Sequence, residues 1–220
     1  MGNVLWRGSP TDPTPGSLPW YRAGGAPAPV EAWDAEGAAT YALSLVGLVI
    51  GTILIEIGGG PINWAAGIGW SGFRALSRCL DTGIVPPNDQ TWSLILKFAG
   101  ATDPTAAHHA AGRREATATG SFGLAPAQIG YRYYLNGSGY ARASPIKTDG
   151  IVAVAGNRGY NEGIIDDGII PAGAGIGTLP IYIGGRNNTI ADAFFNGAIA
   201  KVAVFDYNIA AFVAAITAAM

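Results

Sequence analysis

From residue 92 onward the chain repeats one pattern, in which a short run of β-branched and aromatic residues is followed by Gly, Pro, Asn or Asp. Short strands separated by such turn residues are typical of antiparallel sandwiches and barrels. The sequence therefore predicts an all-β fold, an antiparallel β-sandwich. Its expected strands cover residues 92–98, 129–135, 151–155, 163–170, 179–183 and 198–205.

Residues 91–98 indicate how such a strand divides its side chains between two faces. Successive side chains of a strand point to opposite faces of the sheet. One face carries Trp92, Leu94, Leu96 and Phe98, and the other carries Thr91, Ser93, Ile95 and Lys97. The first face is expected in the core, and the second, being mixed, at the outside of the sandwich.

The chain ends in a different pattern, with apolar residues at helical spacing. Asp206 or Asn208 is a suitable cap at its start. The spacing predicts a short C-terminal helix whose buried face holds Ile209, Phe212, Val213 and Ile216.

Residues 1–30 contain six prolines spread among Gly, Ser, Thr and Ala. Proline restricts both its own backbone and that of the preceding residue, so we predict an extended arm here and a folded domain over residues 31–220. Large aromatic residues on such an arm suggest anchors that dock either on the chain's own body or on a neighbouring copy. Because thirty extended residues reach farther than one sandwich needs, we expect the neighbouring copy, with Trp6, Trp20 and Tyr21 as anchors.

No residue between 37 and 55 is charged, and this length approaches that of a membrane-spanning helix. Small and polar residues dilute its hydrophobicity, Glu56 follows at once, and no Lys or Arg flanks it. We therefore expect no membrane partner, but a short helical piece near residues 38–45 and a buried strand over residues 49–57.

Charge and cysteine content exclude several classes of partner. Charged residues make up 13% of the chain, about half the usual share, and the net charge is -2 without a basic cluster. Nucleic acid is thus not expected as a partner, since phosphate binding needs clustered positive charge. The single Cys79 allows neither an internal disulfide nor a zinc site. No secretory signal is recognised at the N-terminus, so synthesis is expected in the cytoplasm.

Two groups of motifs resemble the concanavalin A-like, laminin G-like jelly rolls. The early group is Trp70-Ser71-Gly72-Phe73, then residues 79–84 and Thr91-Trp92-Ser93; the late group is residues 179–187, then 194–205 and the closing helix. The resemblance covers roughly residues 36–218 and implies a jelly-roll sandwich with a short C-terminal helix. Such domains are also similar to modules of bacteriophage virion and tail proteins.

Glycoside hydrolases that share this fold carry a strand with Glu-x-Asp-x-x-Glu, which aims two carboxyl groups into one cleft. This chain has no such motif, so we expect no enzymatic activity. Asp166-Asp167 are interpreted as a solvated turn and His108-His109 as a surface loop, because neither has partners at catalytic or metal-ligand spacing.

The resemblance implies two candidate sites. Laminin G-like domains often bind calcium at the rim of the sandwich, so calcium is the one cofactor considered, with Asp81, Asn88 and Asp89 or Asp149 as oxygen ligands. A glycan would stack on exposed tyrosines, with Asn and Arg as hydrogen-bond partners; the alternative is that these tyrosines are ordinary strand residues. The candidates for the glycan site are Tyr160, Asn157, Arg158, Arg186 and Asn187, with Tyr131, Tyr133 and Tyr140 as further platforms.

The sequence therefore favours a non-enzymatic structural protein of a viral assembly, in particular a bacteriophage, or of a filament. Its expected partners are copies of itself and other particle proteins, and its expected location is the virion or an extracellular assembly. The alternative is a carbohydrate-binding module or adhesin that recognises a surface glycan.

Overall fold

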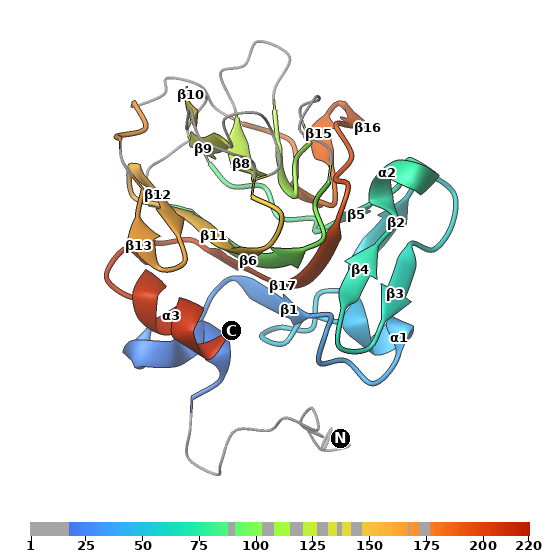
Figure 1. The fold of residues 1–220 in the computed structure, drawn as a ribbon, viewed down its shortest axis with the longest axis horizontal. Helices are drawn as coiled ribbons and strands as arrows, with labels where there is room; N and C mark the ends of the chain where they lie inside the picture. Colours follow the sequence, from blue (N-terminus) through green and yellow to red (C-terminus); the bar gives the residue numbers. More distant parts are fainter. Residues whose placement is uncertain are drawn as a thin grey trace.

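The computed structural model describes residues 18–87, 91–102, 108–114, 121–126, 132–135, 138–141, 147–166, 168–171 and 177–220. Two β-sheets pack face to face, and a small helical layer covers the far side of one of them (Figure 1). No helix in the described ranges has the length and apolar character needed to cross a membrane.

The first sheet, called sheet A, has the strand order β13-β12-β11-β6-β17-β4-β3, with β1 also paired to β17. Its strands are β1 (Glu31–Asp34), β3 (Asn63–Ala65), β4 (Gly69–Ser71), β6 (Ser93–Ala99), β11 (Gly150–Ala155), β12 (Arg158–Asn161), β13 (Ile164–Ile165) and β17 (Ala198–Phe205).

The second sheet, called sheet C, has the order β10-β9-β8-β7-β14-β5-β2, and β15 joins β7 and β16. Its strands are β2 (Ile55–Ile57), β5 (Cys79–Asp81), β7 (Ala111–Arg113), β8 (Phe122–Ala125), β9 (Arg132–Leu135), β10 (Ser138–Ala141), β14 (Tyr182–Ile183), β15 (Arg186–Asn188) and β16 (Ile190–Asp192). Among the described residues the named strands pair antiparallel, except for β15 with β7, which are parallel. The predicted class, a mainly antiparallel two-sheet domain with a short C-terminal helix, is confirmed.

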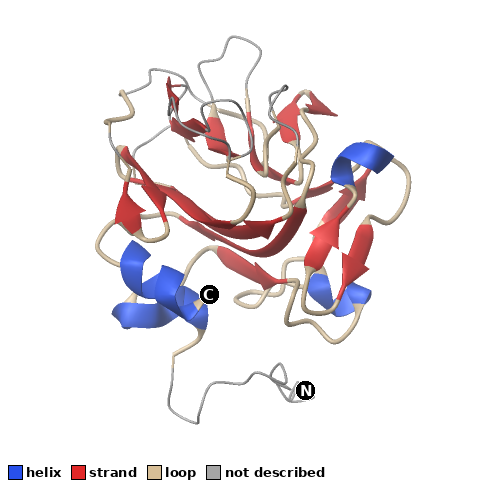
Figure 2. Cartoon of the chain, viewed as in Figure 1, coloured by secondary structure: helices blue, strands red, loops and turns tan. Residues whose placement is uncertain are grey.

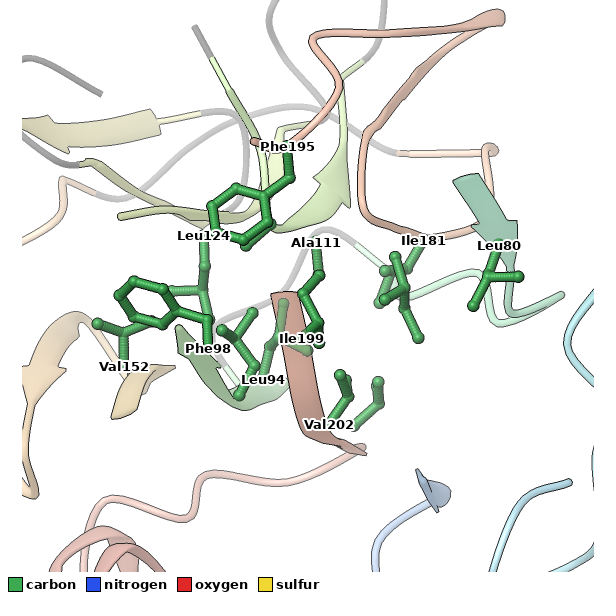
Figure 3. Close-up of a cluster of buried hydrophobic side chains, with 14 of the residues drawn as sticks. Leu80, Leu94, Phe98, Ala111, Leu124, Val152, Ile181, Phe195, Ile199 and Val202 are labelled. Atoms are coloured by element: carbon green, nitrogen blue, oxygen red, sulfur yellow. The ribbon is translucent and has the colours of Figure 1, made fainter. Parts of the chain in front are cut away.

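The core lies between the two sheets. Leu94, Leu96 and Phe98 of β6 point into it, as the alternation predicts, and Trp92 packs at its margin. Figure 3 shows side chains of both sheets meeting there, including Leu80, Leu124 and Ile181 opposite Val152, Ile199 and Val202.

The other face of sheet A is also buried. Ile95, Ala153 and Phe205 pack under the 3-10 helix η1 (Trp20–Gly25) and the C-terminal helix α3 (Val213–Ala219). Figure 2 shows these two helices side by side below the sheet, and η1 contacts α3. The mixed outer face that the sequence predicts for β6 is therefore a second core, because α3 supplies Val213 and Ile216 to cover it.

Part of the predicted extended arm is helical. The turn of η1 forms where proline is missing, since Pro19 and Pro27 flank a proline-free stretch. Residues 1–17 lie outside the described residues.

Residues 37–57 differ in part from the prediction. Helix α1 (Tyr41–Ser44) is the expected short helical piece, with the Thr40 hydroxyl accepting the Leu43 amide. The expected strand over residues 49–57 is reduced to β2, because the Glu31 carboxylate holds the preceding loop instead. Fully buried Glu31 accepts the amides of Val49 at 2.7 Å, Thr52 at 3.0 Å and Ile50 at 3.3 Å. A second short helix, α2, spans Phe73–Leu76.

Tyr133 links the two sheets at one end of the sandwich. Its ring lies against Gly159 of β12, where an added Cβ would come within 2.3 Å of the ring. Its hydroxyl donates to Asp166 at 3.0 Å. The interpretation of Asp166 as a solvated turn is therefore wrong, because this carboxylate is buried under the tyrosine that it accepts from; Asp167 lies outside the described residues.

We expect Tyr133→Phe to lower the free energy of unfolding by roughly 1–3 kcal/mol, since a buried carboxylate loses a donor. Chemical denaturation measures this. Tyr160→Phe is the matched control: Tyr160 is also buried, but no hydrogen bond of its hydroxyl is found among the described residues, so a change below about 0.5 kcal/mol is expected. Equal losses in the two variants would contradict the proposed link.

Candidate functional site

The register of sheet C aligns one row of residues across five strands. Gly123 of β8 pairs with Tyr134 of β9 and with Gly112 of β7. Gly112 pairs with Tyr182 of β14, which pairs with Asp81 of β5. Residues opposite one another in a sheet share a face. The row Tyr134-Gly123-Gly112-Tyr182-Asp81 therefore lies on one side of sheet C, and we call this side the outer face.

The neighbouring row shows which side this is. Tyr133, Leu124, Ala111, Ile183 and Leu80 alternate with the outer-face residues along the same strands, and all five belong to the core cluster. Because side chains alternate along a strand, the outer face points away from the core. Tyr134, Tyr182 and Asp81 are each partly exposed there.

Two glycines separate the tyrosines of the row, and His109 covers one of them. A Cβ on Gly112 would lie 3.3 Å from the His109 ring. That ring stacks on Tyr134, with 5.1 Å between centroids and 22° between planes. The buried imidazole therefore holds the Tyr134 ring in a fixed orientation, so that this ring forms a rigid aromatic surface.

Tyr182 and Asp81 form the polar end of the row. The Gly83 amide donates to Asp81 Oδ1 at 2.8 Å. Burial nevertheless raises the pKa of Asp81, although the Gly83 hydrogen bond lowers it. The pKa of Tyr182 is raised by burial first and then by the charge of Asp81. These shifts show a carboxylate in partly desolvated surroundings, a property typical of functional sites.

The predicted glycan residues fall into two separate groups. Tyr160 and Arg158 lie on β12 of sheet A with Asn157 in the preceding turn, and the Tyr160 ring is buried beside α3. The Arg158 guanidinium donates to the Gly168 carbonyl at 3.1 Å. The structure gives the Tyr160 ring little exposed surface on which a sugar could stack.

Arg186 and Asn187 lie on β15 of the other sheet and are both buried. Arg186 makes two hydrogen bonds to Asp192, at 2.6 and 2.8 Å, and the Asn187 amide donates to the Pro180 carbonyl at 3.1 Å. Their side chains are engaged in holding the β15–β16 hairpin. Glycan binding by either group stays a prediction.

The other predicted residues are placed as follows. Of the calcium candidates, Asp81 lies on the outer face. Asp149 accepts a hydrogen bond from the Thr148 hydroxyl at 2.7 Å. Asn88 and Asp89 lie outside the described residues. No group of three His, Cys, Asp or Glu suited to a metal is found in the described ranges. Tyr131 and Trp6 also lie outside them.

Trp20 and Tyr21 lie in η1, on this chain's own body. Tyr21 is buried in the second core, and its hydroxyl donates to the Leu48 carbonyl at 3.5 Å. Lys201 Nζ lies 5.7 Å from the centroid of the Trp20 ring. Their contribution to contacts between copies stays a prediction.

The interpretation of His108-His109 as a surface loop is wrong. Both imidazoles are buried, because His109 stacks on Tyr134 and His108 Nε2 lies 3.2 Å from the Arg74 guanidinium. Sequence reasoning also missed Tyr182 as a surface aromatic. The signal in the sequence was that Tyr182 stands between two apolar residues, Ile181 and Ile183. Both are fully buried in the structure, and alternation along the strand then places Tyr182 on the outer side.

Neither a protein-family model nor a curated protein matches the sequence. Solved structures do match the fold. Domain 4 of AbnA, a GH43 extracellular arabinanase from Geobacillus stearothermophilus solved in complex with arabinotriose, aligns with a TM-score of 0.60 at 15% identity, over 86% of this chain and 98% of that domain.

Two sialidases align less well. NanB of Streptococcus pneumoniae gives a TM-score of 0.42 at 14% identity, over 70% of this chain and 26% of its own. The sialidase of Trypanosoma rangeli gives 0.45 at 13% identity, over 86% of this chain and 32% of its own.

The match to the arabinanase domain corrects two predictions made from the sequence. The resemblance to laminin G-like and bacteriophage modules is replaced by likeness to a domain of an arabinanase. The same finding contradicts the predicted function as a structural protein of a virion or filament. Likeness at 15% identity shows a shared fold alone, a two-sheet β domain.

Proposed function

We propose that this chain is a carbohydrate-binding module that holds an oligosaccharide on the outer face of sheet C. The observation that carries the proposal is the row of the outer face, in which two partly exposed tyrosines and a carboxylate are aligned by strand register. The matched arabinanase domain, which was solved with arabinotriose, supports the same class of ligand.

The chemistry of the row suits a sugar. The C–H faces of a pyranose or furanose ring pack on aromatic rings, and sugar hydroxyls donate to carboxylates. Tyr182 and Asp81 are cross-strand neighbours, so their Cβ atoms are about 4.5–5.5 Å apart. One sugar unit can therefore contact both. Tyr134 lies three strands from Tyr182, about 14 Å at the usual strand spacing, and the His109 ring lies over Gly112 between them. A ligand that contacts both tyrosines must therefore be an oligosaccharide that passes over this ring.

The proposed module binds without hydrolysing. Glycoside hydrolysis uses two carboxyl groups that flank the scissile bond. The cross-strand neighbours of Asp81 are Tyr182 and Ile55, neither of which is acidic. An extracellular location belongs to the same proposal, since polysaccharides of this kind lie outside the cell and the matched arabinanase is extracellular.

A panel of immobilised glycans tests whether the chain binds sugar at all, and calorimetric titration of the best ligand tests where. We expect Tyr182→Ala to raise the dissociation constant about tenfold or more, because the stacking surface is lost. Tyr182→Phe keeps the ring and should stay within about threefold of the unsubstituted protein. Unchanged binding in Tyr182→Ala would place the ligand elsewhere.

A further inference from the structure

Asp81 differs from the other acidic side chains in its surroundings. Among the described residues, most partly or fully buried carboxylates have a cation or several donors close by. Lys201 lies 3.4 Å from Asp34, Lys97 lies 2.8 Å from Glu36, Arg186 lies 2.6 Å from Asp192, and Glu31 accepts four amides.

Asp81 is partly buried yet has no such compensation. Within the described part of the chain no ion pair includes it, and its one hydrogen bond is the Gly83 amide on Oδ1. Partial burial of an unpaired carboxylate costs free energy. Among the described residues no donor contacts Asp81 Oδ2 and no cation lies beside it, so this partly exposed carboxylate offers an acceptor oxygen and a negative charge on the outer face.

The charge of Asp81 lies next to Tyr182, the ring on which a sugar would stack. Asp81 is directly opposite Tyr182 in the register, so a sugar stacked on Tyr182 lies beside the carboxylate. The remaining row neighbours, Gly112, Gly123 and Tyr134, carry no charge. Any carboxylate on the bound sugar would therefore meet a like charge in partly desolvated surroundings, where screening by water is weak.

Building on the proposed function, we infer that the outer face selects neutral oligosaccharides and rejects acidic ones, with Asp81 as the residue that discriminates. Asp81 accepts a hydroxyl from a neutral sugar stacked on Tyr182, which favours that ligand. It repels the carboxylate of a uronic or sialic acid unit at the same position, which disfavours the other. Attraction of one ligand and repulsion of another together give selectivity.

Matched pairs of oligosaccharides test this inference by calorimetry. Galactotriose and trigalacturonate share a skeleton but differ in their carboxylates, and lactose and 3′-sialyllactose differ by one acidic unit; arabinotriose is added as a neutral pentose probe. For the unsubstituted protein we expect at least tenfold weaker binding of the acidic member of any pair whose neutral member binds. If arabinotriose alone binds among the neutral probes, both acidic probes should bind at least tenfold more weakly than it does.

The gap is the ratio of the dissociation constant of the acidic ligand to that of the neutral one. Asp81→Asn should reduce this gap at least threefold, because the neutral ligand binds more weakly and the acidic ligand binds more tightly. Asp206→Asn, which removes an exposed carboxylate that follows β17, should leave the gap unchanged. Raising the salt concentration on the unsubstituted protein gives a second readout that needs no variant: the gap should shrink, although by less than for a fully exposed pair of charges, because the site is partly buried.

The outcomes separate the two proposals. If no probe binds the unsubstituted protein, both the proposed function and the inference fail. If sugars bind but the acidic members bind equally or more tightly, or if the gap is the same in Asp81→Asn and at high salt, the module remains and the role of Asp81 is overturned.

Discussion

Replacing Glu31 with alanine is expected to lower the free energy of unfolding by roughly 2–4 kcal/mol, one of the largest effects of any single polar substitution here. The buried carboxylate accepts the amides of Val49, Ile50 and Thr52, and these donors lose their partner together. Gly47 lies so close that an added Cβ would be 2.2 Å from Glu31 Cδ. The loop therefore packs directly against the Glu31 carboxylate, and few other groups could accept these amides in its place.

Glu162→Ala is the control for this prediction. Glu162 also accepts a backbone amide, from Ile151 at 2.9 Å, and pairs with Lys147, but its side chain is 47% exposed. Water can replace these partners, so we expect a loss of about 1 kcal/mol or less. Urea denaturation of both variants gives the comparison, and a smaller loss for Glu31→Ala than for Glu162→Ala would refute the role assigned to the buried carboxylate.

Gly69→Ala is expected to cost roughly 3 kcal/mol or more, because two penalties coincide at this position. Gly69 has φ +99°, which side-chain-bearing residues avoid at a cost of about 1–2 kcal/mol. An added Cβ would also lie 2.2 Å from the Ile199 carbonyl oxygen, and moving the backbone of β17 adds about 1–3 kcal/mol. The close approach occurs where β17 shifts register, between Ile199 and Lys201.

Gly67→Ala separates the two penalties. Gly67 has φ +75°, and nothing lies within 4 Å of an added Cβ. It should therefore show only the backbone cost, and the difference between the two variants measures the contact with β17. Equal losses for both variants in thermal unfolding would contradict the close contact between Gly69 and the Ile199 carbonyl of β17.

The runs of β-branched and aromatic residues predicted the position of the longest described strands best, whereas, in the described part of the chain, the predicted runs 163–170 and 179–183 contain only the two-residue strands β13 and β14. The predicted run 198–205 coincides with β17, and 92–98 is displaced by one residue from β6. The terminal helix was also found, although it begins at Val213 rather than at a cap formed by Asp206 or Asn208. The Asn208 side chain accepts the Ala210 amide in the turn before it.

The failures have a common physical cause, namely partners distant in sequence. The loop before β2 could not be recognised because Glu31 lies 18 to 21 residues away from the amides it accepts. His109 looked like a polar loop residue until the fold placed Tyr134 against it. Ile95 looked surface-facing because α3, which covers it, comes more than a hundred residues later.

The candidate site shows the same limit. Sequence reasoning identified Asp81 as an oxygen ligand and chose tyrosines by type. It could not align Asp81 with Tyr182, because the two are about a hundred residues apart and only strand register brings them together. The residues that did stand out by type, Tyr160 and Arg186, are engaged in packing and in an ion pair.

The central claim is that the outer face of sheet C holds the ligand. Backbone amide NMR spectra, recorded while an oligosaccharide that binds is titrated in, test it most directly. The account predicts that shift changes concentrate on Asp81, Gly112, Gly123, Tyr134 and Tyr182, while residues of the opposite helical layer, such as Tyr21 and Val213, stay unchanged. Shift changes centred on that helical layer or on β12, with the outer face unaffected, would contradict the account.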